Sequence, residues 1–177
     1  DGMAVAGTGG SETVHNAGLI TGSVDLGAGA NAFANLAGAG LYSGSVLNLG
    51  AGNLLSNDGL LAPGGVGRRL STTLTGNMVQ RGSGVLDIDF DAMAQQSDRI
   101  DVSGTAALDG TVQMRVTNPT PSDRRVTLVS AQGGISAAGL ALVAHPSAVG
   151  LVVGRALLFP QDDVAAAVDA AAALVHG

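Results

Sequence analysis

The chain has 177 residues, of which 46% are hydrophobic, with a formal net charge of −6, eight arginines, no lysine and no cysteine. The negative charge argues against nucleic acid and anionic membranes as partners, because both attract basic surfaces, and the lack of cysteine excludes disulfide and thiolate chemistry. With 28 glycines and only four aromatic residues, the chain lacks the bulky side chains of a wide interior, so we expect a thin core of stacked coils.

The segment 14–65 repeats itself with a period of about 20 to 23 residues. The tripeptide Gly-Ser-Val at 22–24 returns 22 residues later at 44–46, and Leu-Gly-Ala-Gly at 26–29 returns 23 residues later at 49–52. Each short apolar pair between glycines can form one strand of a coil, and this period is typical of solenoids. The alternative, a glycine-rich linker, would not need valine and leucine at such regular positions.

From Leu70 onward the pattern changes to longer strands with alternating polarity. In the segment 85–91, Leu86, Ile88 and Phe90 point one way and three aspartates point the other, which predicts a strand with one buried and one wet face. Similar strands follow, separated by turns such as Asp109-Gly110, and we expect them to pair as hairpins that cap the coils. The predicted core residues are Leu74, Leu86, Ile88, Phe90, Ile100, Val102, Leu108, Val112, Met114, Val126 and Leu128, with turn glycines at Gly76, Gly104 and Gly110.

The last part of the chain combines two strand patterns with an alanine-rich segment. Segments 140–144 and 151–159 predict strands, whereas 164–175 has valines at near-helical spacing and predicts a short helix or a frayed tail. The sequence is thus divided into coils at 1–70, last coils and cap at 71–160, and a tail or linker helix at 161–177.

An ordered series of motifs in the second half carries a family resemblance. The series runs from Gly-Leu-Leu-Ala-Pro-Gly at 59–64, through Leu-Thr-Gly-Asn-Met-Val-Gln at 74–80 and Leu-Asp-Ile-Asp-Phe at 86–90, to Ser-Asp-Arg-Ile-Asp-Val-Ser-Gly at 97–104. In order and spacing it resembles the junction between the β-helix and the autochaperone region of autotransporter passengers, such as pertactin-like and self-associating adhesin passengers. The similarity covers roughly residues 59–142, with Met78 standing where the family tends to have an aromatic residue.

The resemblance implies an all-β fold, a right-handed parallel β-helix with a C-terminal hairpin or sandwich-like cap. It also implies a structural stalk and adhesin-type binding module at the surface of a Gram-negative bacterium, reached through the periplasm, whose C-terminal region promotes folding during secretion. The expected partners are an outer-membrane β-barrel translocator, which is missing from this sequence, and surface ligands of host or bacterium, or a second copy. We expect no membrane insertion by these residues themselves.

The search for chemistry gives no catalytic, cofactor or metal site. Asp87, Asp89 and Asp91 have the spacing that opens a calcium loop, but Ala92 and Asp98 occupy the positions where such a loop needs glycine and glutamate. The histidines lie far apart, and no serine stands in a Gly-x-Ser-x-Gly frame. We therefore predict no enzyme; the alternatives are a β-helix enzyme that degrades polysaccharides, for which the acidic residues at 12, 25 and 58 are isolated, and a self-association module.

Overall fold

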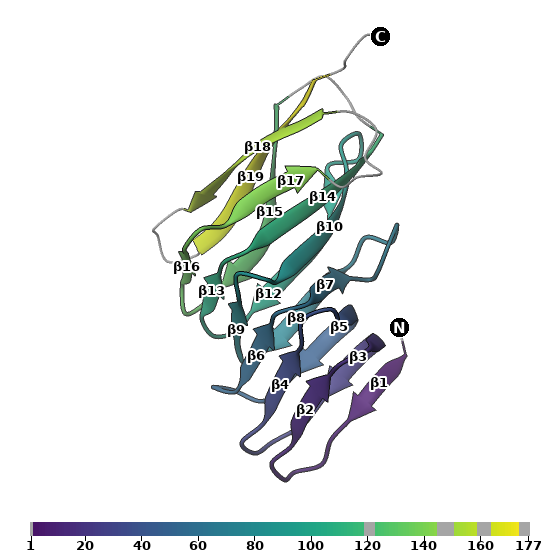
Figure 1. Ribbon diagram of the computed structural model, residues 1–177, viewed down its shortest axis with the longest axis vertical. Coiled ribbons are helices and arrows are strands. Elements are labelled where there is room, and N and C mark those ends of the chain that lie inside the picture. Colours follow the sequence, from purple (N-terminus) through teal and green to yellow (C-terminus); the bar gives the residue numbers. More distant parts are fainter. Residues whose placement is uncertain (1, 119–122, 145–150, 159–163, 174–177) are drawn as a thin grey trace.

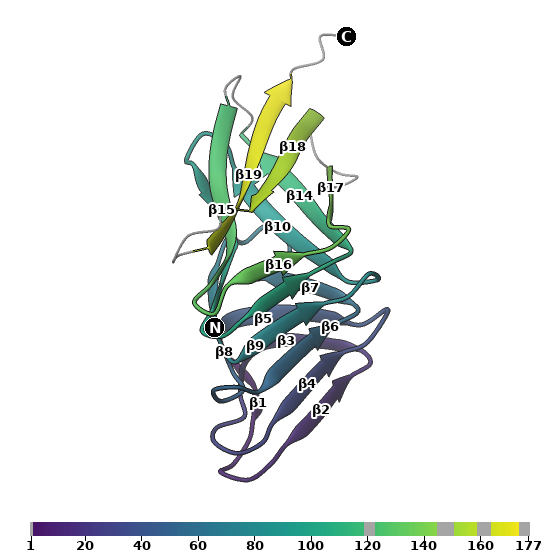
Figure 2. The ribbon, with the colours of Figure 1, turned by 90° about the vertical axis from the view of Figure 1, so that its left-hand side faces the viewer.

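The computed structural model describes residues 2–118, 123–144, 151–158 and 164–173, and every regular element in these ranges is a β-strand. The strands stack as a parallel solenoid, which confirms the predicted fold class (Figure 1). Successive coils follow one another along the long axis, with β1 and β2 near one end and β18 and β19 at the other (Figures 1 and 2).

One face of the solenoid is a six-stranded parallel sheet to which each coil contributes a short strand. Along the axis it contains β2 (Thr13–Asn16), β4 (Ala32–Asn35), β6 (Leu54–Asn57), β9 (Asn77–Gln80), β13 (Ala106–Leu108) and β16 (Ile135–Ala137). The register is constant, so that Phe33 pairs with Leu55 and Leu55 pairs with Met78. Equivalent positions of successive coils therefore form rows along the axis, as expected of a repeat architecture.

The other two faces belong to a single thirteen-stranded sheet, which we describe as two arms. The first arm contains the N-terminal parts of β3 (Leu19–Asp25) and β5 (Gly40–Asn48), then β7 (Leu60–Pro63), β10 (Val85–Asp91), β14 (Thr111–Thr117) and β17 (Ala141–Ala144). The second arm contains β1 (Met3–Ala6), the C-terminal parts of β3 and β5, then β8 (Ser71–Thr75), β12 (Arg99–Val102) and β15 (Asp123–Ala131). Strand β5 joins the arms because its first half pairs with β7 and its second half with β8.

The core is a column of aliphatic side chains between the three faces. On the first arm Leu41, Leu61 and Leu86 form one row, and all three are fully buried. Burying a leucine of this kind stabilises the fold by about 1.5–3 kcal/mol, and each one packs against its own coil and the coils directly above and below. The thin core expected from the shortage of aromatic residues is thus filled by leucine rows.

Glycine at the corners allows coils to approach closely. Gly110, between β13 and β14, has a φ of 72°, and a Cβ atom there would lie 2.5 Å from the carbonyl oxygen of Gly84 in the preceding coil. Gly76, before β9, has a φ of 134°, and its Cβ would lie 2.8 Å from the carbonyl oxygen of Asn53. Both positions therefore require glycine for conformation and for space.

A row of buried amides runs along the edge between the six-stranded sheet and the first arm. Asn16 donates to Asn35 Oδ1 at 2.8 Å, and Asn35 donates to Asn57 Oδ1 at 2.7 Å. Asn16 Nδ2 also donates to the carbonyl oxygen of Gly40, and Asn35 Nδ2 also donates to that of Leu60. In both cases the carbonyl belongs to the following coil. These bonds satisfy polar groups that would otherwise be costly to bury.

Two predictions about the C-terminal half are wrong. The alternating strands of residues 85–117 are not hairpins: β10 and β14 pair in parallel over seven positions, and the turn at Asp109-Gly110 leads from one sheet to the other. Among the described strands, antiparallel pairing occurs between β10 and the short β11 (Gln96–Ser97), between β15 and β19 (Val164–Ala173), and between β18 (Leu151–Leu158) and β19.

The predicted helix at 164–175 is wrong as far as Ala173, and the two residues beyond lie outside the described ranges. Strand β19 pairs with β15 and with β18 on its other side. Backbone pairing with the edge of β15 outweighs the helix preference of alanine, which amounts to less than about 1 kcal/mol per residue. The antiparallel strands β18 and β19 thus cover the end of the second arm.

Candidate functional site

Outward side chains of the second arm form a polar surface across three coils. The inward residues Leu74 and Val102 alternate with outward residues, which places Thr73 on β8 beside Asp101 on β12, and Asp101 beside Ser130 on β15. The register therefore brings together residues that are up to 57 positions apart in the sequence.

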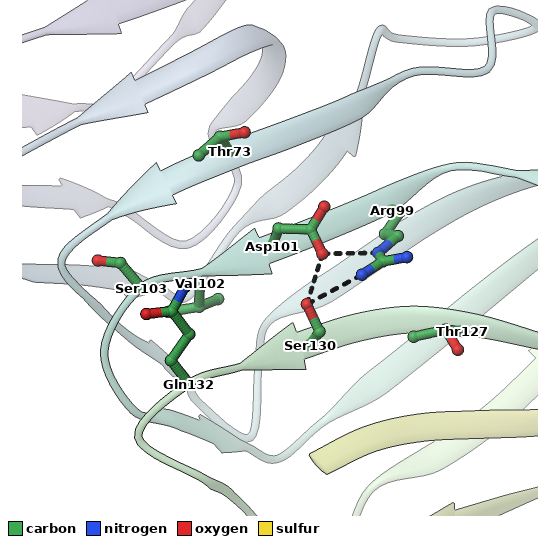
Figure 3. A pocket seen from close by; sticks show the side chains of 8 residues that line it. All are labelled: Thr73, Arg99, Asp101, Val102, Ser103, Thr127, Ser130 and Gln132. Atoms are coloured by element: carbon green, nitrogen blue, oxygen red, sulfur yellow. Dashed lines mark hydrogen bonds and ion pairs between the residues drawn. The ribbon is translucent and has the colours of Figure 1, made fainter. Parts of the chain in front are cut away.

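This surface is hollowed into a cleft of about 430 Å³ (Figure 3). Seven of its eight lining residues are polar or charged, and the lining consists of Thr73, Arg99, Asp101, Val102, Ser103, Thr127, Ser130 and Gln132. Ser103 and Gln132 lie at one end of the cleft and Thr127 at the other, with the charged pair between them (Figure 3). Concave sites with a few converging polar groups are the usual form of ligand-binding sites.

Arg99, Asp101 and Ser130 are bonded to one another at the centre of the cleft. Arg99 Nε donates to Asp101 Oδ1 at 2.6 Å, Arg99 Nη2 donates to Ser130 Oγ at 3.3 Å, and the Ser130 hydroxyl donates to Asp101 Oδ1. The side chains of Arg99 and Asp101 are 43% and 37% exposed, so their pairing adds little stability. The bonds instead hold the guanidinium and the carboxylate in one orientation.

Several groups in the cleft remain available to a ligand. Within the described part of the chain, no hydrogen bond reaches Asp101 Oδ2, and none reaches the side chains of Thr73, Thr127 or Gln132. Of the side chains that the structure describes, a single carboxylate lines the cleft, whereas glycoside hydrolysis commonly uses a pair. The lining is therefore suited to binding by hydrogen bonds.

The predicted core residues lie on the inner faces of the sheets. All of them are buried, with exposed fractions of 9% or less: Leu74, Leu86, Ile88, Phe90, Ile100, Val102, Leu108, Val112, Met114, Val126 and Leu128. Val102 alone among them also borders the cleft. The predicted turn glycines Gly76, Gly104 and Gly110 lie between strands, where a Cβ atom would meet the backbone of the neighbouring coil at 2.8 Å or less.

The predicted wet face of β10 is buried, which corrects the expectation for its three aspartates. Asp87, Asp89 and Asp91 are 7%, 5% and 6% exposed. Arg115 on the next coil lies 3.0 Å from Asp89 and 3.8 Å from Asp87, and Arg69 lies 3.6 Å from Asp91. Cationic partners and the loops at 64–70 and 92–98 allow the carboxylates to be buried.

Asp98 anchors both loops beneath this cluster. Its carboxylate accepts hydrogen bonds from the backbone N–H groups of Leu70 and Asp89, both at 2.7 Å. Burial, together with the negative charges of Asp89 and Asp87, raises the pKa of Asp98 to about 7. In contrast, hydrogen bonds from the backbone of Ala94 and the amide of Asn118 lower the pKa of Asp91.

No group of three or more histidine, cysteine or acidic side chains is placed to hold a metal ion in the described ranges. The positive charge beside the aspartates of β10 comes from Arg69 and Arg115. Nor does any helix among the described residues have the length and apolar character to cross a membrane.

Of the residues that line the cleft, Val102 is the one that belongs to the core and turn residues predicted from the sequence. Alternation along 99–102 does predict that Arg99 and Asp101 face outward. Thr73 and Ser130 could be added only from the register between coils, which pairs Asp101 with both of them. No protein-family model, curated protein or solved structure matches the chain.

Proposed function

We propose that the chain is the C-terminal part of an autotransporter passenger, a cell-surface stalk and adhesin-type binding module of a Gram-negative bacterium whose C-terminal coils promote folding of the coils before them. The observation that supports the proposal most is the long pairing between two C-terminal coils on the first arm. There β10 and β14 pair over seven positions, whereas β5 and β7 pair over four and β7 and β10 over two; β3 and β5, which span both arms, pair over six.

The C-terminal coils also have a covered end. Strand β15 pairs with β19 over eight positions, and β19 pairs with β18, so the last strand of the second arm has a partner on each side. In a solenoid each coil is stabilised by its neighbours, so folding starts where the local pairing is strongest and spreads along the stack. A C-terminal block with this long pairing and a covered end can therefore serve as the template on which the N-terminal coils assemble.

Folding kinetics of the full chain test this order. Leu41 and Leu86 are both fully buried and belong to the same row of the first arm, one in the N-terminal and one in the C-terminal coils. We expect Leu86→Ala to slow refolding, with a φ-value above about 0.5, and Leu41→Ala to leave refolding almost unchanged and to speed unfolding. The reverse assignment of φ-values would contradict the proposed template.

Export is tested separately. The chain is fused to an outer-membrane β-barrel translocator and produced in a Gram-negative host, and intact cells are treated with protease. We expect the chain to be reached by the external protease, and Leu86→Ala to reduce the exposed amount more than Leu41→Ala does. Retention of the wild-type chain in the periplasm would contradict the proposed localisation.

A further inference from the structure

We infer that the cleft over β8, β12 and β15 binds a neutral glycan through pairs of neighbouring hydroxyl groups. The inference rests on the proposed role as a binding module and names its ligand class. It depends on three features of the cleft: the balance of its charges, the groups left free for a ligand, and the rigidity of its central pair.

The lining carries no net charge. Among the described residues, Arg99 and Asp101 are the charged ones that line it, and they are paired at 2.6 Å. An anionic ligand would compete with Asp101 for the guanidinium and meet the carboxylate, and a cationic ligand would meet the guanidinium. A neutral ligand avoids both repulsions, so charge selects against acidic and basic polymers.

The free groups match the hydrogen-bonding pattern of a sugar. Asp101 Oδ2 can accept from two hydroxyls on adjacent carbons, while the Arg99 guanidinium can donate to the oxygen of one of them. Thr73 and Thr127 can donate and accept, and the Gln132 amide offers both functions at the far end of the cleft. A polyhydroxylated chain satisfies such a mixed set, whereas an apolar ligand would leave these groups unpaired.

The central pair is held before any ligand arrives. Ser130 bonds both Arg99 and Asp101, so the orientation of the two groups does not have to be fixed on binding. The three strands that carry the cleft are spaced at about 4.8 Å, which sets its polar side chains in rows across the coils. The ligand chain is therefore expected to lie across the strands, along the solenoid axis.

The affinity of one cleft is expected to be low. Aromatic side chains, which supply stacking area in tight sugar sites, do not line it. A site made of hydrogen bonds alone fits a dissociation constant of about 1 mM, equivalent to about −4 kcal/mol. Many copies on one surface would still retain a polymeric glycan by avidity.

The test is a binding panel with matched variants. The folded chain is titrated with hexasaccharides of glucose and mannose, with oligogalacturonate and with a chitosan oligomer, and binding is followed by NMR chemical shifts. We expect at least one neutral hexasaccharide to shift residues of β8, β12 and β15, and Asp101→Asn to weaken that binding at least tenfold. Thr73→Val should weaken it several-fold.

Two control variants remove the same kinds of side-chain group from parts of the surface outside the cleft. Arg81 pairs with Asp58 at 3.4 Å and donates to Ser56 at 2.9 Å, so Asp58→Asn removes a carboxylate from an equivalent group outside the cleft. Thr21→Val is the control for Thr73→Val, because Thr21 is also exposed on a strand. Neither should change binding.

Three results would overturn the inference: no shift with any neutral sugar, stronger binding of the acidic or basic oligomer, or unchanged binding in Asp101→Asn with a native circular dichroism spectrum. None of them bears on the refolding experiment with Leu41 and Leu86, so failure of the glycan site and failure of the proposed folding role are distinguishable.

Discussion

Asn57 and Gln80 occupy paired positions on β6 and β9, yet Asn57 Nδ2 and Gln80 Oε1 are both buried and have no hydrogen-bond partner among the described residues. The row of amides that begins at Asn16 thus stops at this pair, and Gln80 donates instead to the carbonyl oxygens of Asp109 and Thr111. The boundary between the same two coils also has the shortest strand pairing of the first arm, because β7 and β10 pair over only two positions. The amide row and the pairing of the first arm are therefore both least continuous at the boundary between these two coils.

The first prediction concerns the two sides of that boundary. Asn35 bonds Asn16, Asn57 and the Leu60 carbonyl, so Asn35→Ala should lower the free energy of unfolding by about 2–3 kcal/mol. Asn57→Ala removes one bond and also a buried donor that has no partner, so it should cost about 1 kcal/mol. Urea denaturation measures both, and an equal or larger loss for Asn57→Ala would contradict this account.

The second prediction compares adjacent positions on β13. Leu108 is 3% exposed and belongs to the core, so Leu108→Asp buries a charge without a partner and should cost more than about 4 kcal/mol or prevent folding. Ala107 points to the other side of the sheet, so Ala107→Asp should cost less than about 1 kcal/mol. Soluble yield and thermal unfolding distinguish the two, and similar losses would argue against the orientation of β13.

A third prediction concerns Arg115. Its side chain is 16% exposed and is paired with Asp89 and Asp87, so Arg115→Met leaves buried carboxylates without their cation and should cost about 3–5 kcal/mol. Arg81 is 56% exposed and paired with Asp58, so Arg81→Met should cost no more than about 1 kcal/mol. Chemical denaturation at neutral pH provides the measurement, and a small effect of Arg115→Met would show that the cluster does not need its cation.

The fourth prediction is a pH dependence due to Asp98. Its pKa of about 7 in the folded chain lies above the unfolded value, so the folded state binds the proton more tightly. The resulting stabilisation is complete below about pH 4 and is lost as the pH rises through about 7. We expect the free energy of unfolding to fall between pH 5 and pH 8, and Asp98→Asn to flatten this slope.

Asp91 changes the free energy of unfolding with pH in the opposite direction to Asp98. Because its pKa is lowered in the folded chain, its contribution is present above about pH 4 and is lost on further acidification. The titration of Asp98 is therefore best followed above pH 4.5. A slope between pH 5 and pH 8 that is the same in wild type and Asp98→Asn would contradict the assignment.

The solenoid could be predicted because its signals are local and repeated. The motifs at 22–24 and 44–46 lie on neighbouring strands, β3 and β5, where Gly22 pairs with Ser43 and Val24 with Leu47, one residue out of step with the sequence repeat. The leucine and valine positions of 70–131 follow from alternation, which marks buried faces without any knowledge of neighbours. Parallel and antiparallel pairing leave the same alternation in the sequence, so the strands of the C-terminal coils could not be told from hairpins.

The candidate site depended on information that alternation does not carry. The aspartates of β10 look like a wet face until Arg115, 24 residues beyond the last of them, and the loops at 64–70 and 92–98 are placed over them. Likewise, Thr73, Asp101 and Ser130 form one row only once the lengths of the intervening loops have set the register. The helix predicted from valine spacing at 164–175 was overridden, as far as Ala173, by an available strand edge, which is a property of the tertiary structure.

The parallel stacking of the coils has a mechanical consequence. Backbone hydrogen bonds between neighbouring coils point along the long axis, so tension applied along that axis pulls directly against them. The bonds at each coil boundary then carry the load in series, so the boundary with the weakest pairing yields first. Under a pulling force the coils would unfold one after another, and each unfolded residue would add about 3.3–3.6 Å to the length of the chain. The molecule would then act as an extensible tether.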